Sequence, residues 1–159
     1  MNGFLHLSVG GLLERVAART PAPGGGAVAA VTAASAAALV AMAARFSDRS
    51  ATRAEELRAS LEPLADADAA AYTAVLAAYR LPAGDPTRRT RIADALATAT
   101  DVPRRVAAAA TEVAALAKGL VRDGNPNLTG DARVAEILAT AAAEAAMALV
   151  EINEAAARR

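Results

Sequence analysis

Cysteine and tryptophan are absent from this sequence of 159 residues, which also has only two Phe, two Tyr and one His. Without cysteine there is no disulfide bond, no thiolate metal ligand and no cysteine nucleophile, and such a chain fits the reducing cytoplasm. Seventeen basic and seventeen acidic residues cancel, which removes the electrostatic attraction that dominates nucleic-acid binding. We therefore expect a cytoplasmic protein with no nucleic-acid partner.

Alanine supplies most of the 55% hydrophobic content. It is the best helix former and is depleted in strands, so the composition predicts an all-α bundle of about five helices. The length suits a single domain over residues 1–159. The predicted helices cover roughly residues 8–18, 25–46, 51–79, 87–121 and 129–157. Pro63 should kink or interrupt the third helix, and Pro103 should bend the fourth.

The most informative motif runs from Thr20 to Gly26, where two prolines end one helix and three glycines precede the next. Glycine permits close backbone approaches that a Cβ prevents. The first-turn N–H groups of the next helix have no intrahelical acceptor, so they can meet an anionic or carbonyl-bearing ligand. Residues 27–44 are apolar enough to suggest a membrane span. Their alanine content, with Thr32 and Ser35, favours a buried central helix and no membrane partner.

Three stretches carry a family resemblance that covers nearly the whole chain in order. They are Pro21–Ala30; Asp66–Tyr72 with Ala77–Pro82; and Val102–Pro103 with Gly124–Asn127, Asp131 and Val150–Asn153. These residues resemble the formiminotetrahydrofolate cyclodeaminase and methenyltetrahydrofolate cyclohydrolase family of small helical folate enzymes. The resemblance implies a bundle that forms a homodimer through its helices and binds a tetrahydrofolate derivative in a cleft near the dimer interface.

The resemblance also implies one of two reactions on a one-carbon unit held between N5 and N10 of tetrahydrofolate. One is hydrolysis of the 5,10-methenyl bridge to the 10-formyl form, and the other is ring closure of the 5-formimino form with loss of ammonia. Neither reaction needs a metal or a redox cofactor, because the folate amidine is already electrophilic. We therefore expect no cofactor and no metal site.

Hydrolysis of the cationic bridge needs a base for water and an acid for the departing nitrogen, and a nearby carboxylate favours the positive charge. Asp66 and Asp68 point about 200° apart on a helix, so at most one of them faces the cleft. Tyr72 follows Asp68 by four residues, and this spacing favours Asp68, since an acid beside an aromatic ring could hold a pterin. The alternative is a solvated Asp68 above a half-buried Tyr72.

The remaining candidates follow from the resemblance. Asn125, Asn127 and Asp131 match cleft-lining residues of the family, although a role at the helix start explains Asp131 equally well. Arg45 could meet the polyglutamate tail of folate, and Asn153 is better explained as a helix or interface contact. The predicted site has Asp68 and Asp131 as catalytic residues and Pro23, Gly24, Gly25, Gly26, Tyr72, Asn125, Asn127 and Arg45 as substrate-binding residues.

Several positions depart from the family pattern. Residues 46–54 form a shorter segment than is usual in the family. Ala27 and Gly130 stand where Ser is usual, Arg133 takes a glycine position, and Leu149 replaces an expected Asn. Each change removes a polar group or closes space. A second hypothesis is therefore a catalytically degenerate member that acts as a folate-binding or helix-pairing protein.

Overall fold

The computed structural model describes residues 3–158. Over that range it contains six α-helices, two short 3₁₀ helices and no β-strand. The α-helices are α1 (Val9–Ala17), α2 (Gly25–Arg45), α3 (Thr52–Leu61), α4 (Leu64–Tyr79), α5 (Arg88–Asp123) and α6 (Thr129–Ala157), and the 3₁₀ helices are Phe4–His6 and Pro126–Leu128. The all-α prediction is confirmed.

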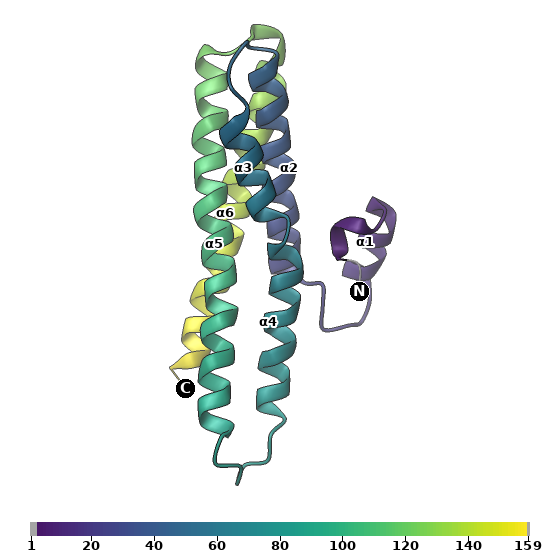
Figure 1. Ribbon diagram of the computed structural model, residues 1–159, viewed down its shortest axis with the longest axis vertical. Coiled ribbons are helices and arrows are strands. Elements are labelled where there is room, and N and C mark those ends of the chain that lie inside the picture. Colours follow the sequence, from purple (N-terminus) through teal and green to yellow (C-terminus); the bar gives the residue numbers. More distant parts are fainter. Residues whose placement is uncertain (1–2, 159) are drawn as a thin grey trace.

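Helices α2 to α6 form one elongated bundle, in which α2 contacts α3, α4, α5 and α6 (Figure 1). The 36 residues of α5 span about 54 Å, whereas the 21 residues of α2 span about 32 Å. Figure 1 shows that α2 begins part of the way along α5, so the lower end of the bundle consists of α4, α5 and the C-terminal part of α6. The N-terminus of α2 therefore faces the space between these three helices.

The two internal prolines act differently. Pro63 separates α3 from α4, so the predicted third helix is two helices, whereas α5 continues through Pro103. Because proline has no N–H, the carbonyl of Ala99, four residues before Pro103, has no intrahelical donor. Asn153 of α6 supplies the missing donor, with its Nδ2 atom 2.7 Å from the Ala99 oxygen.

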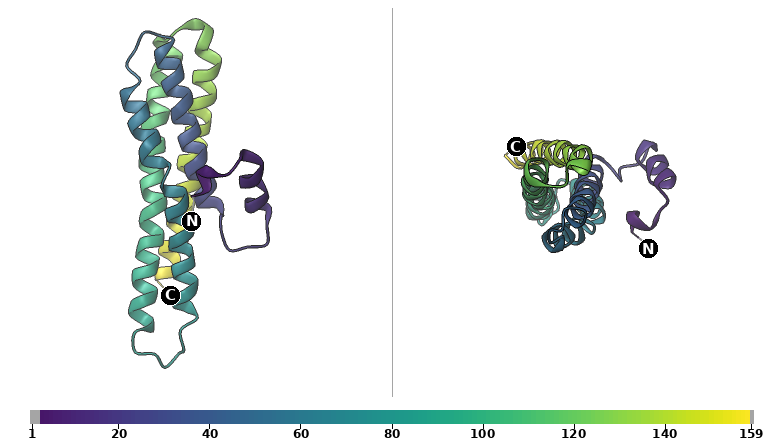
Figure 2. Two further views of the ribbon diagram at one scale, coloured as in Figure 1. Left: turned by 45° about the vertical axis from the view of Figure 1, so that its right-hand side comes forward. Right: turned by 90° about the horizontal axis from the view of Figure 1, so that it is seen from above.

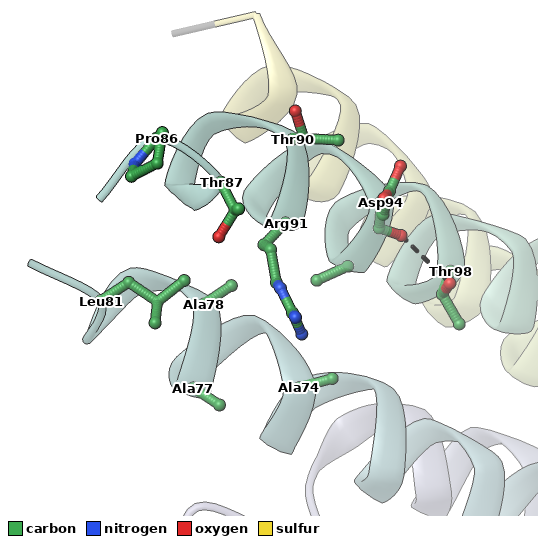
Figure 3. Close-up of a pocket in the computed structure, with 11 residues that line it drawn as sticks. Ala74, Ala77, Ala78, Leu81, Pro86, Thr87, Thr90, Arg91, Asp94 and Thr98 are labelled. Atoms are coloured by element: carbon green, nitrogen blue, oxygen red, sulfur yellow. Dashed lines mark hydrogen bonds between the residues drawn. The ribbon is translucent and has the colours of Figure 1, made fainter. Parts of the chain in front are cut away.

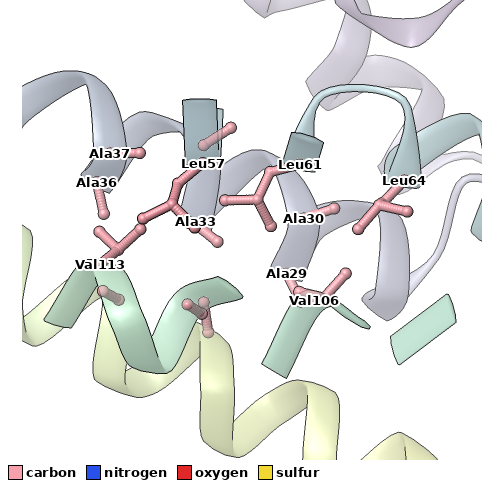
Figure 4. Packing of buried hydrophobic residues seen from close by; sticks show 14 of the residues in the cluster. Ala29, Ala30, Ala33, Ala36, Ala37, Leu57, Leu61, Leu64, Val106 and Val113 are labelled. Carbon is pink, nitrogen blue, oxygen red and sulfur yellow. The ribbon is translucent and has the colours of Figure 1, made fainter. Parts of the chain in front are cut away.

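Helix α2 is the buried central helix that its composition predicts. Twelve of its 21 residues are buried, and ten of these are alanine. Small side chains let neighbouring backbones approach closely, and larger side chains of α3, α4 and α5 fill the space around α2 (Figure 4). These larger residues include Leu57, Leu61, Leu64, Val106 and Val113. By length and composition α2 is also the one described helix able to cross a membrane, although most of it is buried in the bundle.

Helix α1 stands apart from the bundle (Figures 1 and 2). None of its residues is buried, and the side chains of Val9 and Leu13 are largely exposed. The chain before α1 is attached to α4, because the Phe4 N–H donates to Asp66 Oδ1 at 3.0 Å. The chain after α1 returns to the bundle through the buried Pro23.

Candidate functional site

A cavity of about 450 Å³ lies where the N-terminus of α2 faces α4, α5 and α6. The N-cap of α2 and its first turn contribute Gly24, Gly25 and Gly26. Helix α4 contributes Asp68, Tyr72 and Tyr79, and α6 contributes Leu149, Ile152 and Asn153. Among residues 3–158, Asp68 is the one charged side chain that lines this cavity. Within residues 3–158, no group of three His, Asp or Glu side chains is arranged to hold a metal ion.

The carboxylate of Asp68 lies against the first turn of α2. The backbone N–H of Ala27 donates a hydrogen bond to this carboxylate, and a Cβ on Gly26 would overlap it. Burial raises the pKa of Asp68 above its ordinary value, and the Ala27 hydrogen bond partly offsets that rise. A carboxylate with a raised pKa is a stronger proton acceptor than an ordinary aspartate, so Asp68 is suited to general base catalysis.

Helix α4 presents one face to the cavity. Asp68, Tyr72, Val75 and Tyr79 all line it, and their spacings of four, three and four residues place them on one side of the helix. Tyr72 and Tyr79 are each about half exposed. Asp66 is engaged elsewhere, because its carboxylate accepts the Phe4 N–H. Tyr79 was not among the predicted site residues, although the same spacing from Asp68 and Tyr72 would have found it.

The glycine motif contributes backbone to the cavity. Gly24, Gly25 and Gly26 lie in its wall, whereas Pro23 is buried and does not line it. The N–H groups of Gly25 and Gly26 belong to the first turn of α2, where no intrahelical acceptor exists. These two N–H groups are therefore placed to bind an oxygen atom of a ligand.

Arg45, Asn125 and Asn127 lie at the opposite end of the bundle, away from this cavity. Arg45, at the end of α2, pairs with Glu55 at 2.7 Å. The Asn125 side chain holds the connection between α5 and α6, since its Nδ2 donates to the Phe46 carbonyl at 2.8 Å and its Oδ1 accepts the Asn127 N–H at 3.0 Å. Within a single subunit these residues do not join Asp68 in one cleft, and their role in a cleft completed by a second subunit stays a prediction.

Asp131 is also remote from Asp68. It lies in the first turn of α6, and Asn153, which lines the cavity, follows 22 residues later in the same helix. That separation corresponds to about 33 Å along the helix axis. Asp68 and Asp131 therefore do not meet within one subunit, because they lie at opposite ends of the bundle. Their convergence in the cleft of an assembled dimer stays a prediction.

A larger hollow of about 670 Å³ lies between α4 and α5, on the faces that carry Ala74 and Thr98 (Figure 3). Its polar residues include Thr87, Arg91 and Asp94, all of which are exposed. Figure 3 shows the Arg91 side chain extending from α5 toward α4. The acid in this hollow, Asp94, is exposed, whereas Asp68 is half-buried, so we take the smaller cavity as the candidate site.

The fold and the cavity define a small all-helical protein whose cavity has one acid in its described wall, at a glycine-rich helix N-terminus. The model of the formiminotransferase-cyclodeaminase family matches residues 8–158. The chain belongs to this family, which confirms the resemblance seen in its motifs.

Named relatives agree with this assignment. The methenyltetrahydrofolate cyclohydrolase of Methylorubrum extorquens is 34% identical, in a match that covers 89% of this chain and 76% of that protein. The formimidoyltransferase-cyclodeaminase of Mus musculus is 34% identical, in a match that covers 83% of this chain but 28% of that protein. The crystal structure of formiminotetrahydrofolate cyclodeaminase from Thermotoga maritima matches with a TM-score of 0.86 and 31% identity, over 96% of this chain and 80% of that one.

Proposed function

We propose that this chain is a folate one-carbon enzyme that hydrolyses 5,10-methenyltetrahydrofolate to 10-formyltetrahydrofolate. The observation that carries the proposal is the half-buried Asp68, the one charged side chain in the described wall of a cavity of about 450 Å³. This volume lies within the usual range of about 300 to 1,000 Å³ for small-molecule sites. The cyclohydrolase of Methylorubrum extorquens supports hydrolysis, because its match extends over 76% of that enzyme.

Asp68 performs two tasks in the proposed reaction. Its negative charge stabilises the cationic N5–N10 bridge, and its carboxylate accepts a proton from the water that attacks the bridge carbon. The bond between that carbon and N5 then breaks as Asp68 returns the proton to N5. The remaining hydroxyl proton leaves to solvent, and the formyl group stays on N10.

Other groups in the wall orient the substrate. The N–H groups of Gly25 and Gly26 stabilise the oxygen that becomes the formyl carbonyl, since they are preorganised donors at a helix N-terminus. Tyr72 and Tyr79 supply aromatic surface for the pterin ring.

Cyclodeamination is the second candidate function. The Thermotoga maritima structure with a TM-score of 0.86 is a formiminotetrahydrofolate cyclodeaminase, which favours ring closure of 5-formiminotetrahydrofolate with loss of ammonia. The 5,10-methenyl cation is the product of that reaction and the substrate of hydrolysis, so a cavity that recognises this cation serves either chemistry. The degenerate binding protein considered from the sequence is not favoured, because the relatives are named as enzymes.

A homodimer through α2 and α6 is part of the proposal. These helices pack side by side, and large apolar residues on both of them are exposed. They include Val28 on α2, Phe46 directly after α2, and Val134, Ile137 and Ile152 on α6. Pairing these faces with the helices of the two subunits antiparallel would set the Asp131 end of one α6 beside the cavity end of the other. Each site would then contain Asp68 from one subunit and Asp131 of the partner subunit, and this second carboxylate would add to the stabilisation of the cationic bridge, so that loss of either acid inactivates the site.

The proposed enzyme uses no metal and no redox cofactor, since the methenyl bridge is already electrophilic. We assign it to the cytoplasm, on the grounds that a helical chain without cysteine suits a reducing compartment. The proposed enzyme binds neither nucleic acid nor a membrane.

Incubation of the purified protein with 5,10-methenyltetrahydrofolate tests the main proposal through the loss of near-ultraviolet absorbance. We expect the Asp68→Asn substitution to lower kcat/KM by about 100-fold or more. Asp66→Asn is the matched control, because Asp66 lies on the same helix and contacts the Phe4 backbone instead of the cavity. A wild-type rate equal to that of buffer would remove the hydrolysis proposal, and ammonia release from 5-formiminotetrahydrofolate would then favour cyclodeamination.

A further inference from the structure

We propose that Asn153 is a specificity-determining residue whose Oδ1 atom accepts a hydrogen bond from the 2-amino group of the pterin ring. This inference rests on the proposed function, because it assumes that a folate binds in the cavity. It assigns to Asn153 a role beyond the helix contact that the sequence predicted.

The orientation of the Asn153 side chain is set by Pro103. Pro103 cannot donate to the carbonyl of Ala99, and the Asn153 Nδ2 atom fills this place at 2.7 Å. A flipped amide would direct Oδ1 at the Ala99 oxygen, so that two acceptors would face each other and a carbonyl would be left without a donor. The Ala99 oxygen, which Pro103 leaves without an intrahelical donor, therefore fixes which end of the Asn153 amide faces it.

The other end of the same amide is available to a ligand. Asn153 lines the cavity together with Asp68, and the recorded hydrogen bond of its side chain uses Nδ2. No fully buried side-chain oxygen or nitrogen of the described residues lacks a partner, so Oδ1 is open rather than sealed in the interior. Since Asn153 is part of the cavity wall, we assign Oδ1 as a neutral acceptor for the molecule that occupies the cavity.

The two acceptors, the Asp68 carboxylate and the Asn153 amide oxygen, suit different parts of the substrate. A negatively charged carboxylate stabilises the cationic bridge more than a neutral amide oxygen does, so we place the bridge beside Asp68. A neutral amide oxygen matches an uncharged N–H donor, and the 2-amino group of the pterin is such a donor at the end of the ring system away from the bridge. A site built to bond this group discriminates against an analogue that lacks it, because the acceptor is then left unpaired.

A Pro103→Ala background separates this ligand role from the structural role of Asn153. The substitution restores an N–H that can bond the Ala99 carbonyl within α5, so Asn153 is no longer needed there. In this background we expect Asn153→Leu to cost much less folding stability than it does beside Pro103, as measured by denaturant unfolding. This difference keeps the test usable if Asn153→Leu alone does not fold.

Ligand binding is then measured by calorimetry with tetrahydrofolate and with its 2-desamino-2-methyl analogue. The wild-type and Pro103→Ala proteins should both bind tetrahydrofolate about tenfold more tightly than the analogue, as expected for the loss of one hydrogen bond. The Ala99 oxygen still faces the Asn153 amide in the variant, and it disfavours a flip that would set two acceptors against each other. Asn153→Leu in the same background should bind both ligands equally. Asn153→Asp, which keeps an acceptor oxygen, should retain the preference.

The outcomes distinguish this inference from the proposed function. If the Pro103→Ala/Asn153→Leu protein keeps the preference of about tenfold for tetrahydrofolate over the analogue, Asn153 has only a structural role. The inference is then overturned, while folate binding stands. If the wild-type protein and the Pro103→Ala variant bind neither ligand, the proposed function fails and the inference fails with it.

Discussion

Gly26 and Asp68 are in such close contact that a Cβ on Gly26 would overlap the Asp68 carboxylate. The two residues come from different helices, and the contact brings the acid of α4 against the first turn of α2, where Ala27 donates to it. The third glycine of the motif is therefore required by a side chain 42 positions later in the chain as well as by the local backbone. This pair is the basis of the first prediction.

Gly26→Ala should displace Asp68 from the α2 N-terminus. We expect kcat/KM to fall by about 100-fold, because the base loses its position, and the free energy of unfolding to fall by about 1–3 kcal/mol through overpacking. Activity assays and urea unfolding check both changes. Gly119→Ala is the control, since a Cβ there meets nothing within 4 Å, and we expect it to raise stability by about 0.5–1 kcal/mol.

A double variant tests the cause of that destabilisation. Gly26→Ala combined with Asp68→Ala removes the overlap, so its unfolding free energy should be higher than that of Gly26→Ala alone. Additive losses from the two substitutions would show that the Gly26–Asp68 contact is not the reason glycine is needed.

The ionisation of Asp68 should lower the stability of the fold. Its pKa is raised in the native state by burial, so the native protein holds this proton more tightly than the unfolded chain. The stabilisation of the native state by this bound proton is fully present below the pKa of Asp68 in the unfolded chain. It is lost as the pH rises through the pKa of Asp68 in the native state. Asp68→Asn should therefore be more stable than the wild type at neutral pH, and the difference should shrink as the pH falls through the carboxyl range.

Thermal or urea unfolding of both proteins across that pH range provides the measurement. Asp66→Asn serves as the comparison, since it removes a carboxylate from the same helix outside the cavity. A wild-type protein more stable than Asp68→Asn at neutral pH would contradict the assignment of Asp68 as a buried, destabilising base.

Mixing two inactive variants tests whether one site uses both subunits. Asp68→Asn and Asp131→Asn each remove one acid, and after subunit exchange a mixed dimer would contain one site with both acids intact. Random exchange at equal concentrations predicts recovery of about one quarter of wild-type activity. No recovery, together with exchange verified by mass spectrometry, would exclude a site shared in this way.

A charge on the exposed face of α6 should disrupt the proposed dimer. Ile137 is 56% exposed, and Ile137→Glu would bury a carboxylate in an apolar interface, which is unfavourable without a partner. Sedimentation should then show a monomer of about half the wild-type mass. Ala83→Glu adds the same charge to the exposed connection between α4 and α5, and this control should sediment as the wild type does.

Much of the fold was predictable from local pattern. The helix over 129–157 and the glycine entry to α2 match α6 and the start of α2, because capping, proline and glycine act on adjacent residues. The Asp68 face of α4 was also predictable, since the four-residue spacing to Tyr72 is a property of a single helix. The contact of Ala99 with Asn153 was not, because it joins residues 54 positions apart through a carbonyl released by Pro103.

The amino-acid order alone determined that this chain is helical, that α2 is buried and that α2 begins in a run of glycines. These properties follow from alanine content, proline positions and the absence of a Cβ, which act within a few residues. Only the tertiary structure decided that Asp68 meets Gly26 while Asp131 lies at the far end of α6. That outcome depends on helix length and on where each helix begins beside its neighbours, and both are set by packing across the bundle.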